Sequence, residues 1–288
     1  MINFCADDYG ISAESCNRIE ECLKNGVLNK VSVLPNGEIR DFKSRLAGKN
    51  TEVALHINLV EGKPLTDLKE IPLIVNDAGH FKYSFIGLCA LSFSHKRKEL
   101  EKQLEKEIKN QIRFWKNQMG EETQISLDSH QHVYMIPLIF KTVMRVIKEE
   151  NLNVKELRVP AEPLSPYLLT PSLYFSYKPS GLIKQWLLKF FALVNRREFK
   201  AAGIPTTCFM GVLFSGKLSQ DRVKKLLPRY LKIAQRKGQF VEIGFHPGYL
   251  ESGEKPIEGS KESFGKFYYS PWRYVEYTTL INLKTQNK

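Results

Sequence analysis

The residues of this sequence that could do chemistry are a few histidines and two adjacent aspartates. One carboxylate and two neutral imidazoles, with coordination positions left for water, are a common ligand set for a catalytic divalent metal. Such a metal lowers the pKa of its bound water and polarises a carbonyl oxygen, while a further carboxylate and histidine act as general base and general acid. Those parts are supplied by Asp7, Asp8, His56, His130 and His246.

These side chains, and His132 with them, lie at or near the ends of short apolar runs that predict β-strands. The predicted strands alternate with helix-like periods, which indicates an α/β fold with a mostly parallel sheet. Such folds gather their active sites at the C-terminal ends of the strands, so we expect the six side chains to meet. The predicted strands span residues 2–6, 30–34, 52–59, 124–128, 156–159, 207–210 and 240–245.

The segments between the predicted strands carry helix signals. Ser12 is expected to cap a helix that Gly26 closes, and Pro137 stands at the first position of a helix that reaches residue 151. Residues 61–93 form an insertion rich in loop residues, and loops of this length are often functional. No low-complexity linker interrupts the pattern, so residues 1–288 predict a single domain. Further helices are predicted at residues 96–118, 182–201 and 221–237 and after residue 271.

Five short motifs occur in an order that resembles the YdjC-like carbohydrate deacetylases, a family that includes diacetylchitobiose deacetylases and hopanoid-biosynthesis deacetylases. Each motif is weak alone, but five in register are specific. The resemblance extends from Ile2 to the region of Arg273. The motifs are Ala6-Asp7-Asp8-Tyr9-Gly10, His56-Ile57-Asn58-Leu59 with Glu61-Gly62-Lys63-Pro64-Leu65, Asp128-Ser129-His130-Gln131-His132-Val133, Arg158-Val159-Pro160 and His246-Pro247-Gly248.

The resemblance implies a fold, an activity and a role for each residue. The fold would be a TIM-barrel-like (β/α) barrel, incomplete or distorted. The enzyme would hydrolyse the acetyl group from an N-acetylated sugar, either an oligosaccharide or a lipid-linked glycan, and release acetate. By resemblance, Asp8, His56 and His130 hold one divalent metal ion, Mg²⁺ or Zn²⁺. Asp7 is implied as the general base and His246 as the general acid.

The second histidine ligand is not fixed by the residue pattern itself. If the strand before it continues, period-two alternation places Asp128, His130 and His132 on one face, so either histidine could reach the metal. The resemblance favours His130 and leaves His132 as a substrate or supporting residue. Further candidate substrate contacts are Arg158, Asn58 and Tyr9. The chain departs from the family at Tyr134, where a third histidine is usual, and at Tyr9, where phenylalanine is more common.

Two other functions stay open at this point. Another metal-dependent hydrolase on a βα barrel, such as an amidohydrolase or a phosphoesterase, could use the same ligand types, because a barrel alone does not define a reaction. A sugar-binding barrel without catalysis is the other alternative. The presence of both proton-transfer candidates, Asp7 and His246, argues against it.

Composition narrows the class of protein. The chain is 42% hydrophobic and carries a net charge of +12, spread in Lys/Glu mixtures typical of solvated helix faces. No nucleic-acid-binding motif accompanies the charge, so we expect no nucleic-acid partner. The five cysteines are scattered without a C-x-x-C pair, and residues 1–6 leave no room for a secretory signal before Asp7. Both features predict a cytoplasmic protein.

One apolar segment raises the question of a membrane. Residues 182–191 are aromatic, basic and amphipathic, although the apolar run at 186–194 is too short to span a bilayer. The segment is either a helix packed on the barrel or a surface that contacts the inner membrane peripherally and meets a glycolipid substrate. A homodimer is left open.

Overall fold

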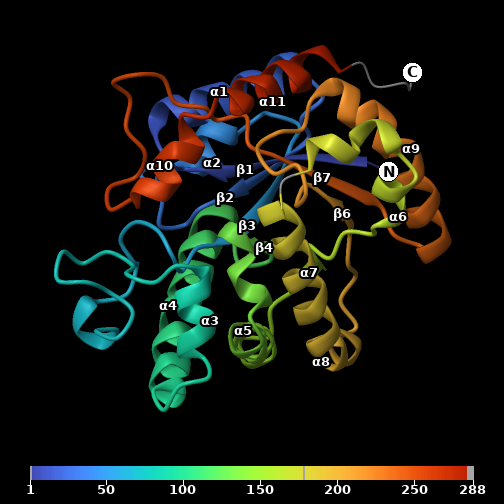
Figure 1. Cartoon of the computed structure of the whole chain (residues 1–288). Coiled ribbons are helices and arrows are strands. Elements are labelled where there is room, and N and C mark those ends of the chain that lie inside the picture. Colours follow the sequence, from blue (N-terminus) through green and yellow to red (C-terminus); the bar gives the residue numbers. More distant parts are fainter. Residues whose placement is uncertain (1, 178, 284–288) are drawn as a thin grey trace.

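A parallel sheet forms the centre of the computed structural model, which describes residues 2–177 and 179–283 (Figure 1). The sheet order is β5-β4-β3-β2-β1-β7-β6, and every neighbouring pair is parallel. All seven predicted strands are therefore confirmed, with small shifts at their ends. The strands are β1 (Ile2–Tyr9), β2 (Lys30–Val33), β3 (Glu52–Ile57), β4 (Ile125–Ser129), β5 (Val154–Leu157), β6 (Cys208–Met210) and β7 (Val241–Phe245).

The sheet curls so far that its two edges nearly meet. Leu157 at the end of β5 donates its backbone N–H to Pro205, 2.9 Å away, and forms a single parallel bridge to Thr206, just before β6. Seven strands and this narrow connection make an incomplete barrel. The expected TIM-barrel-like fold is confirmed in that form.

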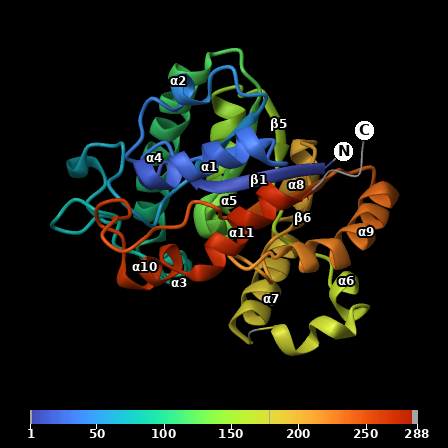
Figure 2. The ribbon, with the colours of Figure 1, turned by 90° about the horizontal axis from the view of Figure 1, so that it is seen from above.

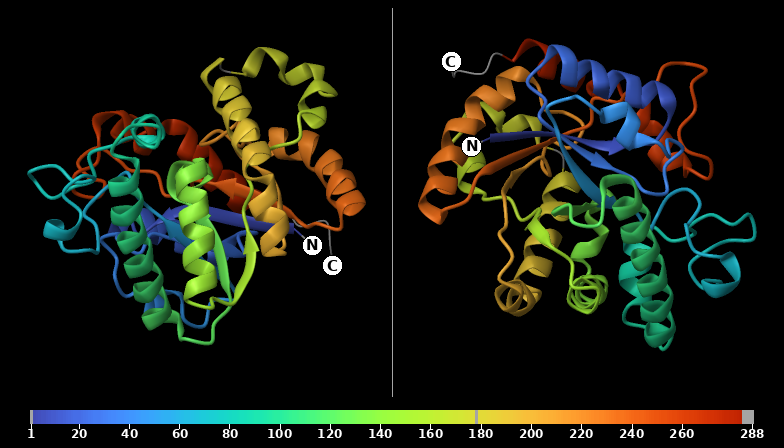
Figure 3. Two further views of the ribbon diagram at one scale, coloured as in Figure 1. Left: turned by 90° about the horizontal axis from the view of Figure 1, so that it is seen from below. Right: turned by 180° about the vertical axis from the view of Figure 1, so that it is seen from behind.

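Helices cover the outer face of the sheet on all sides (Figures 1 and 3). α1 packs against α11 on one side, and α4 packs against α5 on the other. The α-helices are α1 (Ala13–Asn25), α2 (Phe42–Leu46), α3 (Phe85–Leu91), α4 (Arg97–Met119), α5 (Pro137–Glu149), α6 (Ser165–Leu168), α7 (Pro179–Val194), α8 (Arg196–Ala202), α9 (Gln220–Lys237), α10 (Glu262–Tyr268) and α11 (Pro271–Asn282); the 3-10 helices are η1 (Leu68–Glu70), η2 (His130–Met135) and η3 (Pro171–Ser176).

The sequence signals for helix ends correspond to real caps at α1. The Ser12 side chain accepts a hydrogen bond from the Ser15 backbone N–H, and Gly26 follows the last residue of the helix. In contrast, the single helix predicted over 182–201 is two helices, because buried Asn195 interrupts it. The Asn195 side chain donates to the Met135 carbonyl at 2.9 Å. Among the described residues, no helix combines the length and apolarity that crossing a bilayer requires.

The 61–93 insertion is a folded extension beside the sheet rather than a plain loop (Figure 1). It contains η1, α3 and an antiparallel bridge between Val75 and Phe81. Helix α4 holds the start of the insertion in place, because the buried carboxylate of Glu107 in α4 accepts hydrogen bonds from the backbone of Leu65 and Thr66. The insertion is thereby fixed relative to β3.

The two faces of the strands differ in character. Outward-facing residues such as Ala6, Val31 and Leu55 pack under the helices and form the hydrophobic core. Residues at alternate positions point into the barrel, and there the side chains are polar or charged, as at Lys30 and Glu242, both buried. A charged barrel interior therefore lies directly beneath the strand ends.

Candidate active site

The end of β1 is irregular at the two aspartates. The register with β2 shifts between Ala6 and Tyr9, and Asp8 has a φ of +67°, in the left-handed region that non-glycine residues seldom occupy. In a regular strand, adjacent side chains point to opposite faces. Here the irregularity lets both Asp7 and Asp8 line the same pocket.

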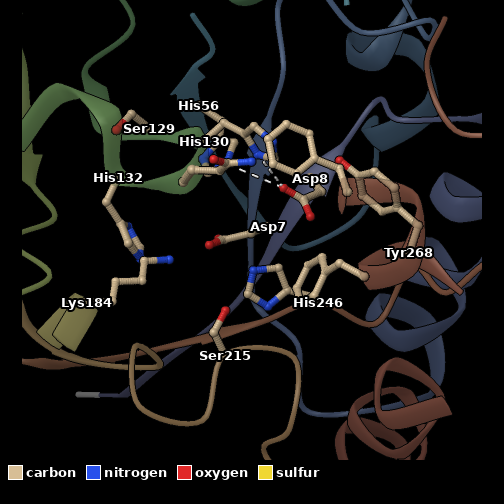
Figure 4. A pocket seen from close by; sticks show the side chains of 13 residues that line it. Asp7, Asp8, His56, Ser129, His130, His132, Lys184, Ser215, His246 and Tyr268 are labelled. Atoms are coloured by element: carbon tan, nitrogen blue, oxygen red, sulfur yellow. Dashed lines mark hydrogen bonds and ion pairs between the residues drawn. The ribbon is translucent and has the colours of Figure 1, made fainter. Parts of the chain in front are cut away.

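The pocket lies at the C-terminal ends of the strands and has a volume of about 160 Å³ (Figure 4). Asp7, Asp8, His56, His130 and His246, predicted from separate motifs, all line it. The structure thus brings the five residues together. The remaining lining residues are Ser129, Gln131, His132, Lys184, Ser215, Phe264, Phe267 and Tyr268.

Three of these residues form a compact group of ligands that could hold a metal. One ligand atom from each of Asp8, His56 and His130 lies within 4.8 Å of the others. Asp8 Oδ1 is 2.9 Å from His130 Nδ1 and 3.7 Å from His56 Nε2. The donor set is one carboxylate and two imidazoles, all buried. This composition fits a divalent transition metal.

Each member of the group is held by a charged partner behind it. His56 Nδ1 is 2.6 Å from Asp128, and His130 Nε2 is 2.9 Å from Glu61. The other oxygen of Asp8 accepts from Arg273 at 3.3 Å. Carboxylates placed behind histidines in this way fix the imidazole orientation and are common around protein-bound metals.

The charges of the group support one another. Burial alone would raise the pKa of Asp8, but the charge and hydrogen bond of His130 outweigh it and hold the pKa well below the usual range. Burial lowers the pKa of His56, yet the Asp128 carboxylate raises it to about 10. The opposite shifts of Asp8 and His56 have one cause, the attraction between the imidazoles and the carboxylates beside them.

Two other groups of potential ligands lie deeper, and Arg158 already occupies both. One group is Cys5, Asp128 and Glu242, and the other is Asp7, His56 and Asp128. The Arg158 guanidinium is 2.7 Å from Asp7, 2.7 Å from Asp128 and 2.6 Å from Glu242. A second cation there would meet strong repulsion. The group around Asp8 is therefore the better candidate for a metal.

Asp7 and His246 lie close to the ligand group but outside it (Figure 4). Arg158 orients Asp7 through the ion pair at 2.7 Å. His246 follows β7 and stacks edge-on against Phe267 at 5.1 Å. Its backbone N–H donates to Glu276, and its buried Nδ1 has no hydrogen-bond partner among the described residues. Its Nε2 is then the nitrogen available to the pocket.

His132 faces the pocket from a different position than strand alternation suggests. β4 ends at Ser129, and the chain turns into η2 with positive φ at Gln131 and His132. The strand therefore does not continue through the two histidines, and His132 lies outside the ligand group beside Lys184 (Figure 4). Burial, followed by the positive charges of Lys184 and Arg158, lowers its pKa well below the ordinary value.

Three of the predicted substrate contacts do not line the pocket. Tyr9 is buried and donates to Glu20 at 2.8 Å. The Asn58 side chain donates to Asn36 at 3.1 Å and shapes the turn after β3. Arg158 is buried among three carboxylates inside the barrel. Of the four predicted contacts, the structure places His132 at the pocket.

Comparison with known proteins identifies the family of this chain. The profile of a family described as YdjC-like protein matches residues 1–288. This chain belongs to the YdjC-like family. A protein of Clostridium beijerinckii named carbohydrate deacetylase is 29% identical over 160 residues, covering 54% of this chain and 60% of that protein. One of the same name from Geobacillus stearothermophilus is 28% identical over 202 residues, covering 68% and 75%.

A solved structure supports the fold of this YdjC-like chain. The crystal structure of a proposed cellobiose-phosphate cleavage protein from Enterococcus faecalis V583 superposes with a TM-score of 0.67 at 16% identity. It covers 98% of this chain and 90% of that one. At this identity the likeness concerns the fold alone.

Several residues at the site had no predicted role. Lys184 shares a face of α7 with buried Leu188, four residues on, so helical periodicity could have placed it inward. Glu61 stands in a motif quoted for the family, but nothing near it indicated a contact with His130. Arg273 and Glu276 come from α11, far along the chain, and no local pattern marks them.

Proposed function

We propose that this pocket hydrolyses the acetamide group of an N-acetylated sugar and releases acetate. One observation supports the proposal: a group of potential metal ligands lies in one small pocket, and a further carboxylate and a further histidine line the same pocket. Those are the parts that metal-assisted amide hydrolysis requires. The two relatives named carbohydrate deacetylase support the same reaction class.

Asp8, His56 and His130 would hold the metal. Their buried oxygen and nitrogen donors suit Zn²⁺ or a related ion, and Mg²⁺ is the other candidate. When bound, the ion supplies a Lewis acid that polarises the acetyl carbonyl and acidifies water. Asp128 and Glu61 would keep the two histidines oriented toward it.

Asp7 and His246 would move the protons. Asp7 accepts the proton of the attacking water, and the Arg158 ion pair holds its carboxylate in position. His246, through Nε2, donates a proton to the amine as the C–N bond breaks. Glu276, whose Oε2 is 3.7 Å from Nδ1, stabilises the charged imidazole. Acetate and a free amino sugar result.

The pocket surrounds the reacting group rather than a whole saccharide. Its volume of about 160 Å³ is below the roughly 300–1,000 Å³ that encloses a drug-sized ligand. Phe264 and Phe267 offer apolar surface to the acetyl methyl and the sugar ring. Lys184 and His132, which lie side by side in Figure 4, offer polar contacts. The remainder of the substrate would extend out of the pocket.

Acetate release tests the proposal directly. Protein treated with a chelator and then reloaded with Zn²⁺ or Mg²⁺ is assayed on a panel of N-acetylated oligosaccharides and glycolipids. We expect acetate to appear with the loaded protein and to be lost after chelation. Absence of acetate from every member of the panel with metal-loaded protein would overturn the proposal.

A phosphoesterase is the second candidate because of Lys184. Its amino group faces the pocket and has no hydrogen bond or ion pair among the described residues, so it could receive a phosphate. Release of phosphate instead of acetate from a phosphorylated, N-acetylated disaccharide would favour this reaction.

A further inference from the structure

The positive charge of the chain is concentrated in one segment. Residues 163–241 contain fourteen of the 43 Lys and Arg residues but two of the 31 Asp and Glu residues, a formal charge of +12. The other residues are balanced, with twenty-nine of each sign. The whole net charge of the protein therefore belongs to the part of the chain that includes α6, α7, α8 and α9.

The exposed apolar side chains are concentrated in the same segment. Of the seventeen large hydrophobic side chains that are exposed in the described part of the chain, ten lie between residues 168 and 194. They are Leu168, Leu169, Tyr174, Phe175, Leu182, Ile183, Trp186, Phe190, Leu193 and Val194. We call this set the apolar arc.

The apolar arc stands away from the barrel. In Figures 2 and 3, α6, η3 and α7 form a curved projection beside the sheet. On α7, Ile183, Trp186 and Phe190 recur at helical spacing and are 69%, 64% and 58% exposed. Proteins seldom leave a contiguous stripe of this kind uncovered unless it binds something.

The opposite face of α7 is firmly anchored. Gln185, Leu188 and Phe191 are buried, and the Gln185 side chain donates to the Glu162 carbonyl at 2.7 Å. The Glu162 carboxylate in turn accepts from the backbone of the segment after β6. The exposed stripe is thus the outer face of a helix with a fixed position.

Helix α7 connects the apolar arc to the pocket. Lys184 lines the pocket, and its sequence neighbour Ile183 belongs to the arc. Exposed Arg196 and Arg197 follow α7 directly at the start of α8. The arc is therefore next to the pocket at Ile183 and next to exposed cations beyond Val194, its last residue.

We propose that the apolar arc docks on a lipid bilayer that carries anionic headgroups, so that the pocket meets an acetylated sugar borne by a lipid. Apolar side chains would enter the headgroup region while the surrounding cations contact the anionic surface. A second copy of this chain fits the arc less well, because it would bring two segments of the same, positive charge together. The substrate part of the inference rests on the proposed deacetylation; the docking does not.

Vesicle co-sedimentation tests the docking. Wild-type protein is mixed with vesicles of phosphatidylcholine alone or with phosphatidylglycerol, and compared with the triple variant Ile183→Ser, Trp186→Ser, Phe190→Ser. We expect the anionic vesicles to bind the wild type and the triple variant to bind at least about tenfold more weakly. Leu68→Ser, an exposed leucine outside the arc, should bind like wild type.

The charge contribution is tested by a matched pair of variants. Arg196→Glu with Arg197→Glu should reduce binding by about tenfold or more and remove its dependence on salt. Lys98→Glu with Lys102→Glu, exposed on α4 in the balanced part of the chain, should change it little. Circular dichroism and melting temperature establish that every variant is folded.

The outcomes separate the docking from the reaction. Equal binding of anionic vesicles by wild type and the folded triple variant, or no binding at all, would overturn the docking. A concentration-dependent dimer that the triple variant abolishes, without vesicle binding, would assign the arc to a second copy instead. If the docking holds, the triple variant keeps its activity on a soluble N-acetylated sugar but loses it on a vesicle-borne one. If neither the soluble nor the vesicle-borne sugar released acetate, the proposed deacetylation would be wrong, while the docking would stand.

Discussion

Charged side chains are paired with one another in the interior of the barrel, whereas some polar side chains of the pocket above it lack partners in the described part of the chain. In the interior, Arg158 is paired with Asp7, Asp128 and Glu242, and Lys30 contacts Glu52, Glu156 and Glu242. In the pocket, Lys184 and His132 have no hydrogen bond or ion pair among the described residues, and His246 Nδ1 lacks a hydrogen bond. The two interior cations are thus paired with carboxylates, whereas Lys184 and His132 in the pocket have neither an ion-pair nor a hydrogen-bond partner in the described part of the chain.

The contrast indicates what each layer does. Buried charges that satisfy one another hold their neighbours in place, so the interior orients Asp7 and, through Asp128, His56. Buried polar groups without partners cost free energy, which a bound ligand can recover by completing their contacts. Changes in the interior should therefore lower the stability of the fold as well as turnover, whereas changes in the pocket should act mainly on turnover.

Removing the central cation of the interior should have the largest effect. Arg158→Met leaves Asp7, Asp128 and Glu242 without their shared partner, so we expect a loss of about 3–5 kcal/mol in the free energy of unfolding. Denaturant titration measures it, with the exposed Arg113→Met as control. A loss no greater than that of Arg113→Met would contradict the role assigned to the interior.

The next largest effect is expected on turnover, at Asp7, which contacts the interior through Arg158 and also lines the pocket. Asp7→Asn removes the proposed base, so kcat for acetate release should fall by about 10²- to 10⁴-fold while the bound metal stays at the wild-type level. Asp8→Asn should lose the metal as well, and the exposed Asp221→Asn should behave like wild type. Unchanged turnover in Asp7→Asn would exclude it as the base.

The variant Lys184→Met tests whether a charged residue of the pocket acts on turnover rather than on stability. Burial lowers the pKa of Lys184, so removing the amine should not destabilise the fold, and any gain in stability should shrink as pH rises toward the ordinary lysine pKa of about 10.4. If Lys184 contacts the substrate, kcat/KM falls by about 10- to 100-fold. Lys189→Met, on the same helix, is the control. Reduced stability with unchanged kcat/KM would place Lys184 in the interior layer instead.

The smallest expected effect is an acid-dependent loss of stability at the rim of the interior. Although burial raises the pKa of Glu52, Lys30, Lys155 and Ser126 together lower it to about 2. The ionised Glu52 carboxylate therefore stabilises the fold at every pH above the pKa of glutamate in the unfolded chain. This stabilisation is lost as pH falls through about 2. Glu52→Gln should therefore remove about 1–2 kcal/mol at neutral pH and flatten the pH dependence of unfolding between about pH 5 and 2. If the free energies of unfolding of wild type and Glu52→Gln showed the same pH dependence, the ion pairs of Glu52 would not contribute to stability.

The sequence predicted the strands well, because apolar runs and helical periods are local signals. It placed a single helix over 182–201, since nothing local shows that Asn195 turns inward to the Met135 carbonyl. The convergence of the site was predictable from strand ends. The contacts of Glu61 and Arg273 were not, because each partner is distant in sequence.

The finer geometry of the site depends on irregular backbone. Strand alternation predicts opposite directions for Asp7 and Asp8, and a shared face for His130 and His132. The register shift and the positive φ of Asp8 bring the first pair together, and positive φ at Gln131 and His132 separates the second. Departures of this kind have no hydrophobic period to mark them in the sequence.

The most direct test of the account is the metal dependence of acetate release in two histidine variants. His130→Ala and His132→Ala are freed of metal, titrated with Zn²⁺ or Mg²⁺, and assayed on an N-acetylated sugar that the wild type hydrolyses. We predict that the wild type and His132→Ala regain activity at about one ion per chain, as a single three-ligand site requires, and that His130→Ala neither binds the ion nor releases acetate. Acetate release by metal-free wild type, or by His130→Ala at the wild-type rate, would contradict a metal site formed by Asp8, His56 and His130.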